Sequence, residues 1–395
     1  MIVNRTIEHE LASLAEQYPV ITVTGPRQAG KTTLVRKVFP RKPYVNLERP
    51  STQEFIAADP HQFLAQYPQG AIFDEIQWRP ELLSYIQAIV DELDAKGMFV
   101  VTGSQQFSLN QAITQSLAGR TALIELLPLS IVELMAAGFD LSLNDYILHG
   151  CFPRIYKDHL SPTKTYRFYY QTYLERDVRQ LINVKDLISF QRFIKLCAGR
   201  IGQILEVSNL ANEAGVSSHT VKHWLSILEA SYLIFRLPPY FENLGKRFIK
   251  SPKLYFTDVG LAAYLLGITD LVQIDRDPLR GALVENLVIV ELLKTLLNHG
   301  LDHELYFYRD QQKNEIDVIL KRAHQLIPIE IKAGQTMQTE FLKGLRYFNK
   351  LVGERCEQGY LIYSGKDEFK VDKFKILNYK NCSQAVLPAL DEEKS

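Results

Sequence analysis

The stretch VTGPRQAGKTTLVRKVF, residues 23–39, decides how the first part of this chain folds. The residues that lead into it, VITVT (20–24), are apolar and β-branched, as expected of a buried parallel strand. TTLVRKVF, at the other end, has the pattern of a helix. Between them the chain matches the pattern G-x-x-x-x-G-K-[ST], with four residues in the required places: Gly25, Gly30, Lys31 and Thr32. The stretch therefore predicts a strand, a phosphate-binding loop and a helix in succession.

The two glycines permit backbone conformations that turn successive N–H groups toward phosphate oxygens, and the start of the helix adds its positive end. Lys31 would reach the β- and γ-phosphates of ATP, and the hydroxyl of Thr32 would ligate Mg²⁺. The predicted nucleotide-binding residues are Gly25, Pro26, Arg27, Gln28, Ala29, Gly30, Lys31, Thr32 and Thr33. A tight turn without a ligand is the simpler alternative.

Two further strands end in polar residues that complete such a site. GAIFDEIQW (70–78) is an apolar strand ending in adjacent acids. Asp74 would hold the magnesium ion and belongs to the nucleotide site, while Glu75 would orient and deprotonate the attacking water. GMFVVTGSQQF (97–107) reads as another buried strand, after which Ser104 could contact the γ-phosphate. An ordinary polar turn is the alternative reading of that strand end.

The order GPRQAGKT, IFDE, VVTGSQQ resembles the AAA+ branch of P-loop ATPases. The continuation SLAGRTALIELLPLSIVEL (116–134) resembles the bacterial and archaeal AAA-family ATPases whose C-terminal half is a domain of unknown function (DUF4143-type). The resemblance implies that Arg120, in the GR pair, is a catalytic arginine finger completing a neighbour's site. Arg120 could instead pair with a surface acid. Arg176, in YLERDVRQL (173–181), is a second candidate finger, and the sequence does not choose between them.

The segment 205–258 reads as helix, glycine turn, helix and hairpin, which is the spacing of a winged helix-turn-helix. Polar residues of its second helix could reach DNA: Ser218, His219, Thr220 and Lys222. The hairpin gathers positive charge from Arg236, Lys246, Arg247, Lys250 and Lys253. We therefore predict DNA as a partner. The alternative is a lid or a protein-contact module.

The C-terminal part places acids on a helix and on two strands. The helix LRGALVENLVIVELLKTLLNHG (279–300) carries Glu285, and the strands EIDVIL (315–320) and LIPIEIKAG (326–334) follow it. A hairpin turn centred on residues 323 and 324 would put Asp317 directly across from Glu330. Opposed acids favour a cation between them, so we predict that Glu285, Asp317 and Glu330 bind Mg²⁺ or Mn²⁺.

Lys332 shares a strand face with Glu330 and would act as a catalytic residue on the hydrolytic water. The pattern resembles PD-(D/E)xK nucleases, with Asp317, Glu330 and Lys332 matching the motif and the proline of its name missing. A charged, exposed hairpin is the alternative.

The predicted fold class is α/β: a P-loop AAA+ parallel sheet, a helical and winged-helix segment, and an α/β restriction-endonuclease-like domain. The expected domains are residues 1–140 (ATPase), 141–200 (helical linker or lid), 201–268 (winged-helix-like) and 269–395 (nuclease-like). With 395 residues, several domains are expected. The formal net charge is zero, so contact with nucleic acid would need a local patch.

Four widely spaced cysteines argue against disulfides and zinc, and no apolar run is long enough to cross a bilayer. We expect a cytoplasmic protein without membrane contact.

These predictions combine into an Mg²⁺-dependent ATPase that acts on DNA and carries a metal-dependent nuclease domain. The alternative is a nucleotide-switched DNA- or protein-binding regulator whose C-terminal domain docks without cleaving. A third reading is a remodeller of protein partners. An arginine finger acting in trans would imply a homo-oligomer, although no stretch of sequence dictates a ring.

Overall fold

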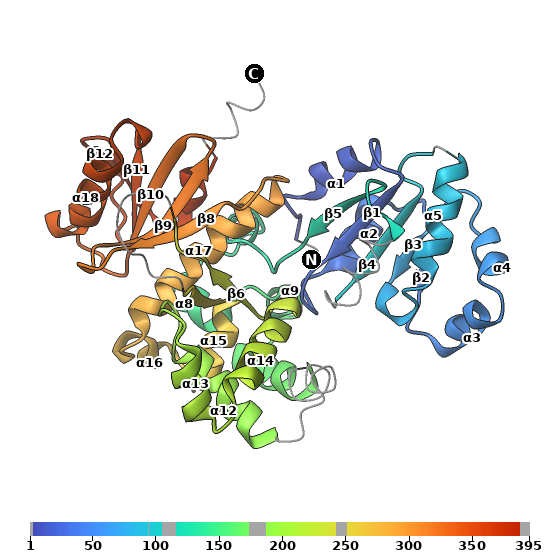
Figure 1. Cartoon of the computed structure of the whole chain (residues 1–395), viewed down its shortest axis with the longest axis horizontal. Coiled ribbons are helices and arrows are strands. Elements are labelled where there is room, and N and C mark those ends of the chain that lie inside the picture. Colours follow the sequence, from blue (N-terminus) through green and yellow to red (C-terminus); the bar gives the residue numbers. More distant parts are fainter. Residues whose placement is uncertain (1–2, 94, 105–115, 174–186, 242–250, 388–395) are drawn as a thin grey trace. The chain divides into compact units, whose positions relative to one another are not determined.

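The computed structural model describes residues 3–93, 95–104, 116–173, 187–241 and 251–387 (Figure 1). The chain divides into two compact units. The first comprises Met1–Leu129, Ala230–Tyr232 and Leu297–Leu301, and the second comprises Ser130–Glu229, Leu233–Leu296 and Asp302–Ser395.

The first unit is built on a five-stranded parallel sheet with the order β2-β3-β4-β1-β5. Its strands are β1 (Val20–Thr24), β2 (Tyr44–Asn46), β3 (Ile72–Asp74), β4 (Phe99–Gly103) and β5 (Thr121–Glu125). β4 lies between β1 and β3, so the C-terminal ends of the loop-bearing strand and the acid-bearing strand flank the end of β4. The three strands predicted from the sequence are confirmed.

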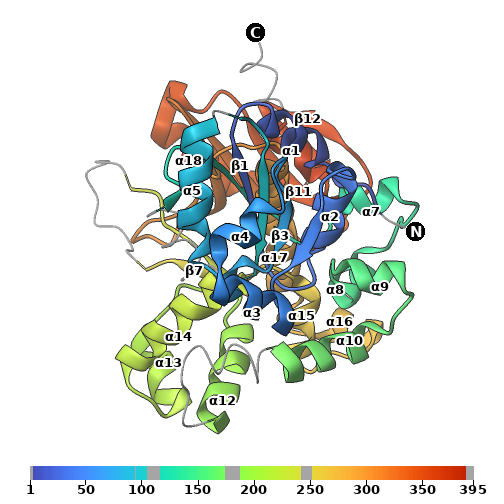
Figure 2. The same cartoon turned by 90° about the vertical axis from the view of Figure 1, so that its right-hand side faces the viewer.

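Helices cover both faces of this sheet (Figures 1 and 2). They are α1 (Glu8–Ala15), α2 (Lys31–Val38), α3 (Pro50–Ala58), α4 (Pro60–Ala65) and α5 (Leu82–Leu93), with the 3₁₀ turn η1 (Ile76–Trp78). Side chains of α1 and α2 pack with one face of β1, while α4 and α5 pack with β3 and β4 on the other. Parallel strands buried on both faces explain the unbroken apolar run VITV. The parallel α/β fold predicted for this region is confirmed.

The second unit begins with helices. They are α7 (Ile131–Ala136), α8 (Leu143–His149), α9 (Pro153–Lys157), α10 (Pro162–Tyr169), α12 (Leu187–Ala198), α13 (Val207–Ala214), α14 (Ser218–Ala230), α15 (Val259–Leu265), α16 (Leu271–Arg276) and α17 (Arg280–Asn298). A short antiparallel ribbon pairs β6 (Ile234–Leu237) with β7 (Lys253–Phe256). α13 ends at Gly215 in a left-handed conformation, and the Ser217 hydroxyl accepts the Thr220 N–H at the start of α14. The described elements follow the order helix, turn, helix and ribbon that the sequence predicts.

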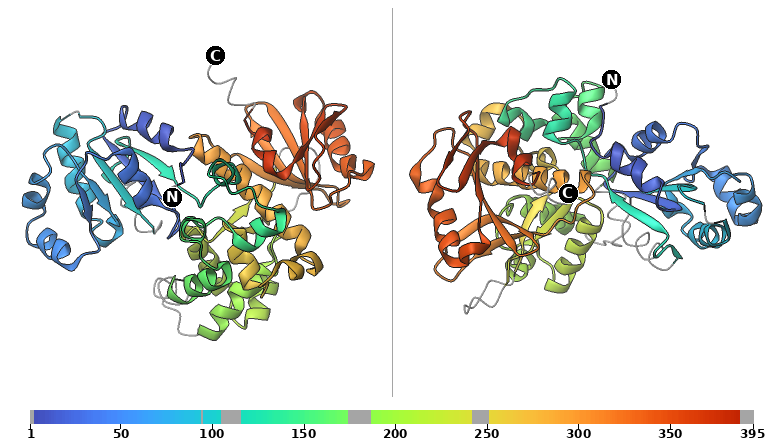
Figure 3. Two further views of the ribbon diagram at one scale, coloured as in Figure 1. Left: turned by 180° about the vertical axis from the view of Figure 1, so that it is seen from behind. Right: turned by 90° about the horizontal axis from the view of Figure 1, so that it is seen from above.

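The C-terminal sheet has six strands in the order β12-β13-β11-β10-β9-β8 (Figure 3). They are β8 (Leu305–Arg309), β9 (Glu315–Arg322), β10 (Gln325–Lys332), β11 (Gly359–Tyr363), β12 (Phe369–Val371) and β13 (Phe374–Asn378). β10 and β11 are parallel, whereas β8, β9 and β10 are antiparallel neighbours, so the sheet is mixed. Its other elements are α18 (Lys343–Val352), whose apolar side packs against the sheet, and the 3₁₀ turns η3 (Thr339–Leu342), η4 (Gly353–Arg355) and η5 (Tyr379–Ala385).

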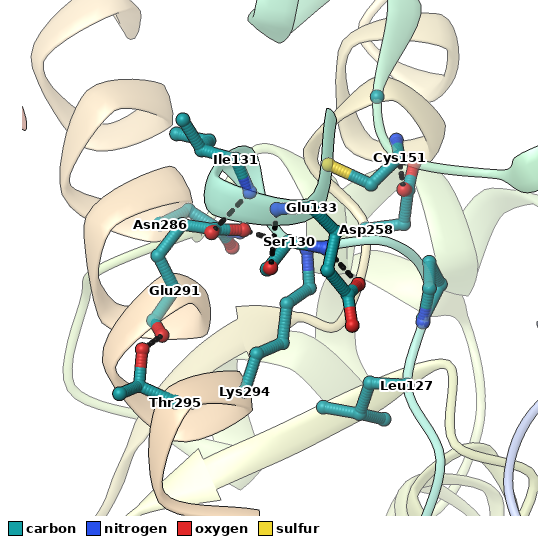
Figure 4. A network of polar contacts seen from close by, with 12 residues as sticks. Leu127, Ser130, Ile131, Glu133, Cys151, Asp258, Asn286, Glu291, Lys294 and Thr295 are labelled. Carbon is teal, nitrogen blue, oxygen red and sulfur yellow. Dashed lines mark hydrogen bonds and ion pairs between the residues drawn. The ribbon is translucent and has the colours of Figure 1, made fainter. Parts of the chain in front are cut away.

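Buried polar side chains of α17 contact both α7 and the ribbon strand β7 (Figure 4). Glu291 accepts the Ile131 N–H at 2.6 Å and pairs with Lys294 at 2.7 Å, and both side chains are buried. Five residues before Glu291, the side chain of Asn286 accepts a hydrogen bond from the Phe256 N–H in β7 at 2.8 Å. It also donates to the Phe256 carbonyl oxygen at 2.9 Å. α17 is therefore held against α7 through Glu291 and against β7 through Asn286.

The four cysteines, Cys151, Cys197, Cys356 and Cys382, are free and buried. Among the described residues, none of the helices combines the length and hydropathy that a membrane crossing requires.

Candidate functional site

The loop between β1 and α2 is shaped by backbone conformations that few residues adopt. Gly25, Gln28 and Gly30 have φ values of 141°, 66° and 96°. A Cβ on Gly25 would lie 2.1 Å from the carbonyl oxygen of Leu126, so this position accepts only glycine. The loop therefore curls back over the first turn of α2, and the predicted residues Pro26, Arg27, Gln28, Ala29 and Thr33 lie within this loop and turn.

Lys31 is buried and points into this loop. Its ammonium group donates to the carbonyl oxygens of Gly25 and Pro26 at 2.9 and 2.8 Å. Burial lowers the pKa of Lys31 to about 8, although the charges of Glu75 and Asp74 act in the opposite direction. The loop thus holds a positive group whose two present partners are carbonyl oxygens, weaker acceptors than phosphate oxygens.

The carboxylate of Asp74 gathers hydroxyl groups from three elements. Thr32 Oγ1 donates to Asp74 Oδ2 at 2.9 Å, and Tyr44 donates to the same oxygen at 2.6 Å. Thr102 of β4 donates to Asp74 Oδ1. The structure therefore brings together Thr32 and Asp74, the pair predicted to hold magnesium.

Glu75 adopts a left-handed backbone conformation with φ of 61°, a strained state for a glutamate. Its Oε2 accepts hydrogen bonds from Ser104 Oγ at 3.2 Å and from Gln77 Nε2. Gln77 also donates to Ser104 at 3.3 Å. Ser104 thus lies beside the predicted catalytic acid, and the two side chains hold the carboxylate in place.

Three side chains of this site were not predicted from the sequence. Buried Arg5 donates to Ala29 O at 3.0 Å and to Leu127 O at 2.8 Å, and so joins the loop to the chain that leaves β5. The others are Tyr44 and Gln77. No motif marks these residues, and only the strand order β2-β3 brings Tyr44 to Asp74.

Arg120 lies just before β5, where Thr121 pairs with Val20 at the start of β1. It is thus at the opposite end of the strands from its own phosphate loop. Its guanidinium pairs with Asp91, with one nitrogen–oxygen distance of 2.9 Å, on the protein surface. The other candidate finger, Arg176, lies outside the described residues.

The predicted C-terminal residues also come together. The ladder between β9 and β10 runs from Gln325↔Arg322 to Ile329↔Val318, and its continuation sets Glu330 across from Asp317, as predicted. Lys332 Nζ lies 2.6 Å from Glu330 Oε1 and 3.8 Å from Asp317 Oδ2. Burial raises the pKa of Glu330 to about 8, and the charge of Asp317 adds to the shift. Glu330 Oε2 is buried without a hydrogen-bond partner.

Glu285 of α17 lies in the same group, where burial and then the charge of Asp317 raise its pKa to about 7. Lys253 was predicted to contribute to a DNA-binding surface, and this is wrong. Only 2% of its side chain is exposed, because its ammonium pairs with Glu285 at 3.1 Å and Glu315 at 2.6 Å. We call Glu285, Glu315, Asp317 and Glu330 the carboxylate cluster. Within the described ranges, no group of three or more His, Cys, Asp or Glu residues is arranged to hold a metal ion as it stands.

The other residues of the predicted DNA surface differ in how exposed they are and in whether they form ion pairs. On α14, Ser218, His219 and Lys222 are exposed, and Thr220 is half-buried. Arg236 pairs with Glu229, with a nitrogen–oxygen distance of 3.0 Å. Lys246, Arg247 and Lys250 lie outside the described residues.

The parallel sheet, the strained loop after β1 and the acids at the end of β3 define the first unit as a P-loop nucleotide-binding domain. Residues 17–135 match the family model described as "AAA domain". Residues 140–272 match "Domain of unknown function (DUF8612)", and residues 280–382 match "Domain of unknown function (DUF4143)". The predicted AAA domain and DUF4143 domain are therefore confirmed, whereas the likeness to PD-(D/E)xK nucleases stays a prediction.

The chain is 29% identical over 371 residues to the uncharacterized proteins Rv2008c of Mycobacterium tuberculosis and Mb2031c of Mycobacterium bovis. These matches cover 93% of this chain and 82% of each relative. Among solved structures it is similar to the Walker-type ATPase PABY2304 of Pyrococcus abyssi (16% identity, TM-score 0.44, 67% of this chain and 96% of that one). Another is AMPPCP-bound DnaA of Aquifex aeolicus (14% identity, TM-score 0.28, 56% and 85%).

The lowered pKa of Lys31 predicts a pH dependence of nucleotide affinity. Phosphates favour the charged ammonium, so above about pH 8 binding requires the uptake of a proton by Lys31. The affinity for ATP should fall by up to about tenfold per pH unit above that value, until the pKa of the bound state is reached. Titrations with a fluorescent ATP analogue from pH 7.5 to 9.5 measure this. Lys31→Met should remove the dependence, and an identical pH profile in both proteins would contradict it.

Proposed function

We propose that this chain is an Mg²⁺-dependent ATPase that acts on DNA and carries a metal-dependent nuclease site in its C-terminal domain. The observation that carries the ATPase part is the convergence of Lys31, Thr32, Asp74 and Glu75 at one edge of the parallel sheet. Cytoplasmic location and assembly into a homo-oligomer belong to the same proposal.

The residues present suit a magnesium nucleotide. Gly25 allows the loop to pack against the carbonyl of Leu126, and Lys31 supplies a buried positive charge. Thr32 and Asp74 offer the hard oxygen ligands that Mg²⁺ prefers. The bound ion would neutralise charge that develops on the phosphate oxygens.

The chain's own residues then perform the remaining tasks. Glu75 accepts a proton from the attacking water, whose oxygen forms a bond to the γ-phosphorus while the bond to the β–γ bridging oxygen breaks. In the state described here Ser104 and Gln77 hold this carboxylate, and Ser104 would contact the γ-phosphate. Arg120 lies at the opposite end of the strands from its own phosphate loop, so it would act as an arginine finger in the nucleotide site of a neighbouring copy. Arg176 is the second candidate for this role.

Substitutions separate binding from hydrolysis. Lys31→Ala should abolish ATP turnover by removing a phosphate contact and should weaken nucleotide binding. Glu75→Gln should bind ATP normally and lose turnover by about 100-fold or more, because an amide accepts no proton. Phosphate release and equilibrium nucleotide binding measure the two effects. Lys37→Ala, an exposed lysine on the same helix, is the matched control and should behave as wild type. Equal turnover in all four proteins would refute these roles.

DNA contact is proposed for α14, whose exposed side chains include His219 and Lys222. Lys222→Ala should weaken binding to all DNA sequences alike and should reduce the salt slope of the affinity by about one, because one phosphate contact is lost. Fluorescence anisotropy at several salt concentrations measures this. Lys370→Ala, an exposed lysine in β12, is the control. An unchanged slope for Lys222→Ala would place DNA contact elsewhere or exclude it.

The nuclease part of the proposal is supported by the placement of Asp317, Glu330 and Lys332. The partnerless oxygen of Glu330 and its carboxylate neighbour suit a divalent ion, which would polarise the scissile phosphate. Lys332 would position the hydrolytic water.

Cleavage of DNA with Mg²⁺ or Mn²⁺ should fall by at least about 100-fold in Asp317→Asn and in Lys332→Met, since each removes a group that acts on the metal or the water. The exposed Asp367→Asn is the control and should cleave as wild type. Gel assays on single- and double-stranded substrates, DNA and RNA, measure the rates.

If wild type cleaves none of these substrates, the second candidate function stands: a nucleotide-switched DNA- or protein-binding regulator with a docking C-terminal domain. The observation that favours this candidate is Lys253, whose ammonium already compensates two of the four clustered carboxylates.

A further inference from the structure

Lys253 reaches the carboxylate cluster from a different part of the second unit. It is the first residue of β7, which pairs with β6 in the ribbon that follows α14. Its ammonium lies 3.1 Å from Glu285 of α17 and 2.6 Å from Glu315 of β9. Tyr255, two residues along the same face of β7, donates to Glu285 Oε1 at 2.5 Å. Two groups of the ribbon, the Lys253 ammonium and the Tyr255 hydroxyl, therefore contact Glu285.

The cluster consequently has two unequal halves. In the first, Glu285 and Glu315 are matched by Lys253, and Arg309 lies 3.4 Å from Glu315 Oε2. In the second, the backbone N–H of Ile331 and the ammonium of Lys332 serve Asp317 and Glu330. Glu330 Oε2 belongs to the second half and is buried without a hydrogen-bond partner. Asp317 and Glu330 are therefore the carboxylates with room for a further cation.

We propose that Lys253 is a resident cation that denies Glu285 to a divalent metal ion, so that the ion binds at Asp317 and Glu330 and gains Glu285 only when β7 releases it. An ammonium and a metal ion within reach of one carboxylate repel each other, and the buried surroundings screen that repulsion weakly. The inference rests on the metal-dependent part of the proposed function.

This arrangement links the ribbon to the metal. Lys253 is held in place by the pairing of β7 with β6 and by Asn286, which bonds the backbone of Phe256. Any partner that shifts β7 would free Glu285 and strengthen metal binding. By reciprocity, the metal would favour that partner by the same factor.

Binding of Mn²⁺ alone to the full chain tests the proposal, measured by calorimetry and by the electron paramagnetic resonance of free Mn²⁺. The titrations use no nucleotide and an Asp74→Asn background, so that the N-terminal site does not contribute. Lys253→Met should bind Mn²⁺ at least about tenfold more tightly than the background protein, because Glu285 becomes available. Lys253→Arg keeps the charge and should bind as the background protein does.

A second substitution distinguishes a freed ligand from a general change in charge. Adding Glu285→Gln to Lys253→Met should abolish the gain in affinity. Lys321→Met, which removes a half-buried lysine of β9 that pairs with Glu304, should show no gain. If Lys253→Met alone fails to fold, as judged by circular dichroism, Lys253→Met with Glu315→Gln restores the net charge of the cluster and should still show tighter binding.

The outcomes separate this inference from the nuclease proposal. Equal Mn²⁺ affinity with and without Lys253, or a gain that survives Glu285→Gln, overturns the role of Lys253 and leaves a metal site in place. No Mn²⁺ binding by any variant overturns both. Tighter binding by Lys253→Met without cleavage of nucleic acid supports the role of Lys253 and counts against the nuclease.

Discussion

The first unit depends on one constraint, which is that the buried carboxylate of Asp74 must be supplied with hydrogen-bond donors. Burying a carboxylate without partners costs several kcal/mol, whereas each hydrogen bond to a charged group returns about 1.5–3 kcal/mol. The donors Thr32, Tyr44 and Thr102 belong to α2, β2 and β4. They meet at Asp74 because β3 lies between β2 and β4, and because α2 leaves the end of the nearby strand β1. The geometry of the nucleotide site is thus a consequence of strand order, and the phosphate loop alone would not produce it.

The two acidic sites of this chain are compensated in different ways. Asp74 is served by neutral hydroxyls, so its negative charge remains and attracts a cation. The carboxylate cluster is served largely by ammonium groups, Lys253 on one side and Lys332 on the other. Acidic residues therefore yield an electrostatically open site in the first unit and a partly neutralised one in the second.

Motifs and spacing in the sequence predict the structure correctly where the relevant contacts are local. The loop from Gly25 to Thr32 and the hairpin that opposes Asp317 and Glu330 are set by residues a few positions apart, so motif and register were enough. Tyr44, Arg5 and Lys253 were missed or misread because their partners lie far along the chain. Arg5 donates to Leu127, and Lys253 pairs with Glu285 and Glu315. Such contacts follow from the order of strands and helices, which a single sequence does not reveal.

Lys253 also shows why a basic stretch of sequence is a poor guide to surface charge. Along the chain Lys253 groups with Arg236 in a positive hairpin. In the structure Lys253 pairs with the half-buried acids Glu285 and Glu315, whereas Arg236 pairs with Glu229. Where an acid is already removed from solvent, an ammonium beside it offsets part of the desolvation cost, so an acid cluster holds a lysine of a neighbouring element away from the surface. In this chain, the acids of α17 and β9 draw inward a cation that the sequence of the ribbon would assign to DNA. Among the described residues of the predicted DNA surface, Lys222 of α14 is exposed, whereas Lys253 of the ribbon is tied to the electrostatics of the carboxylate cluster.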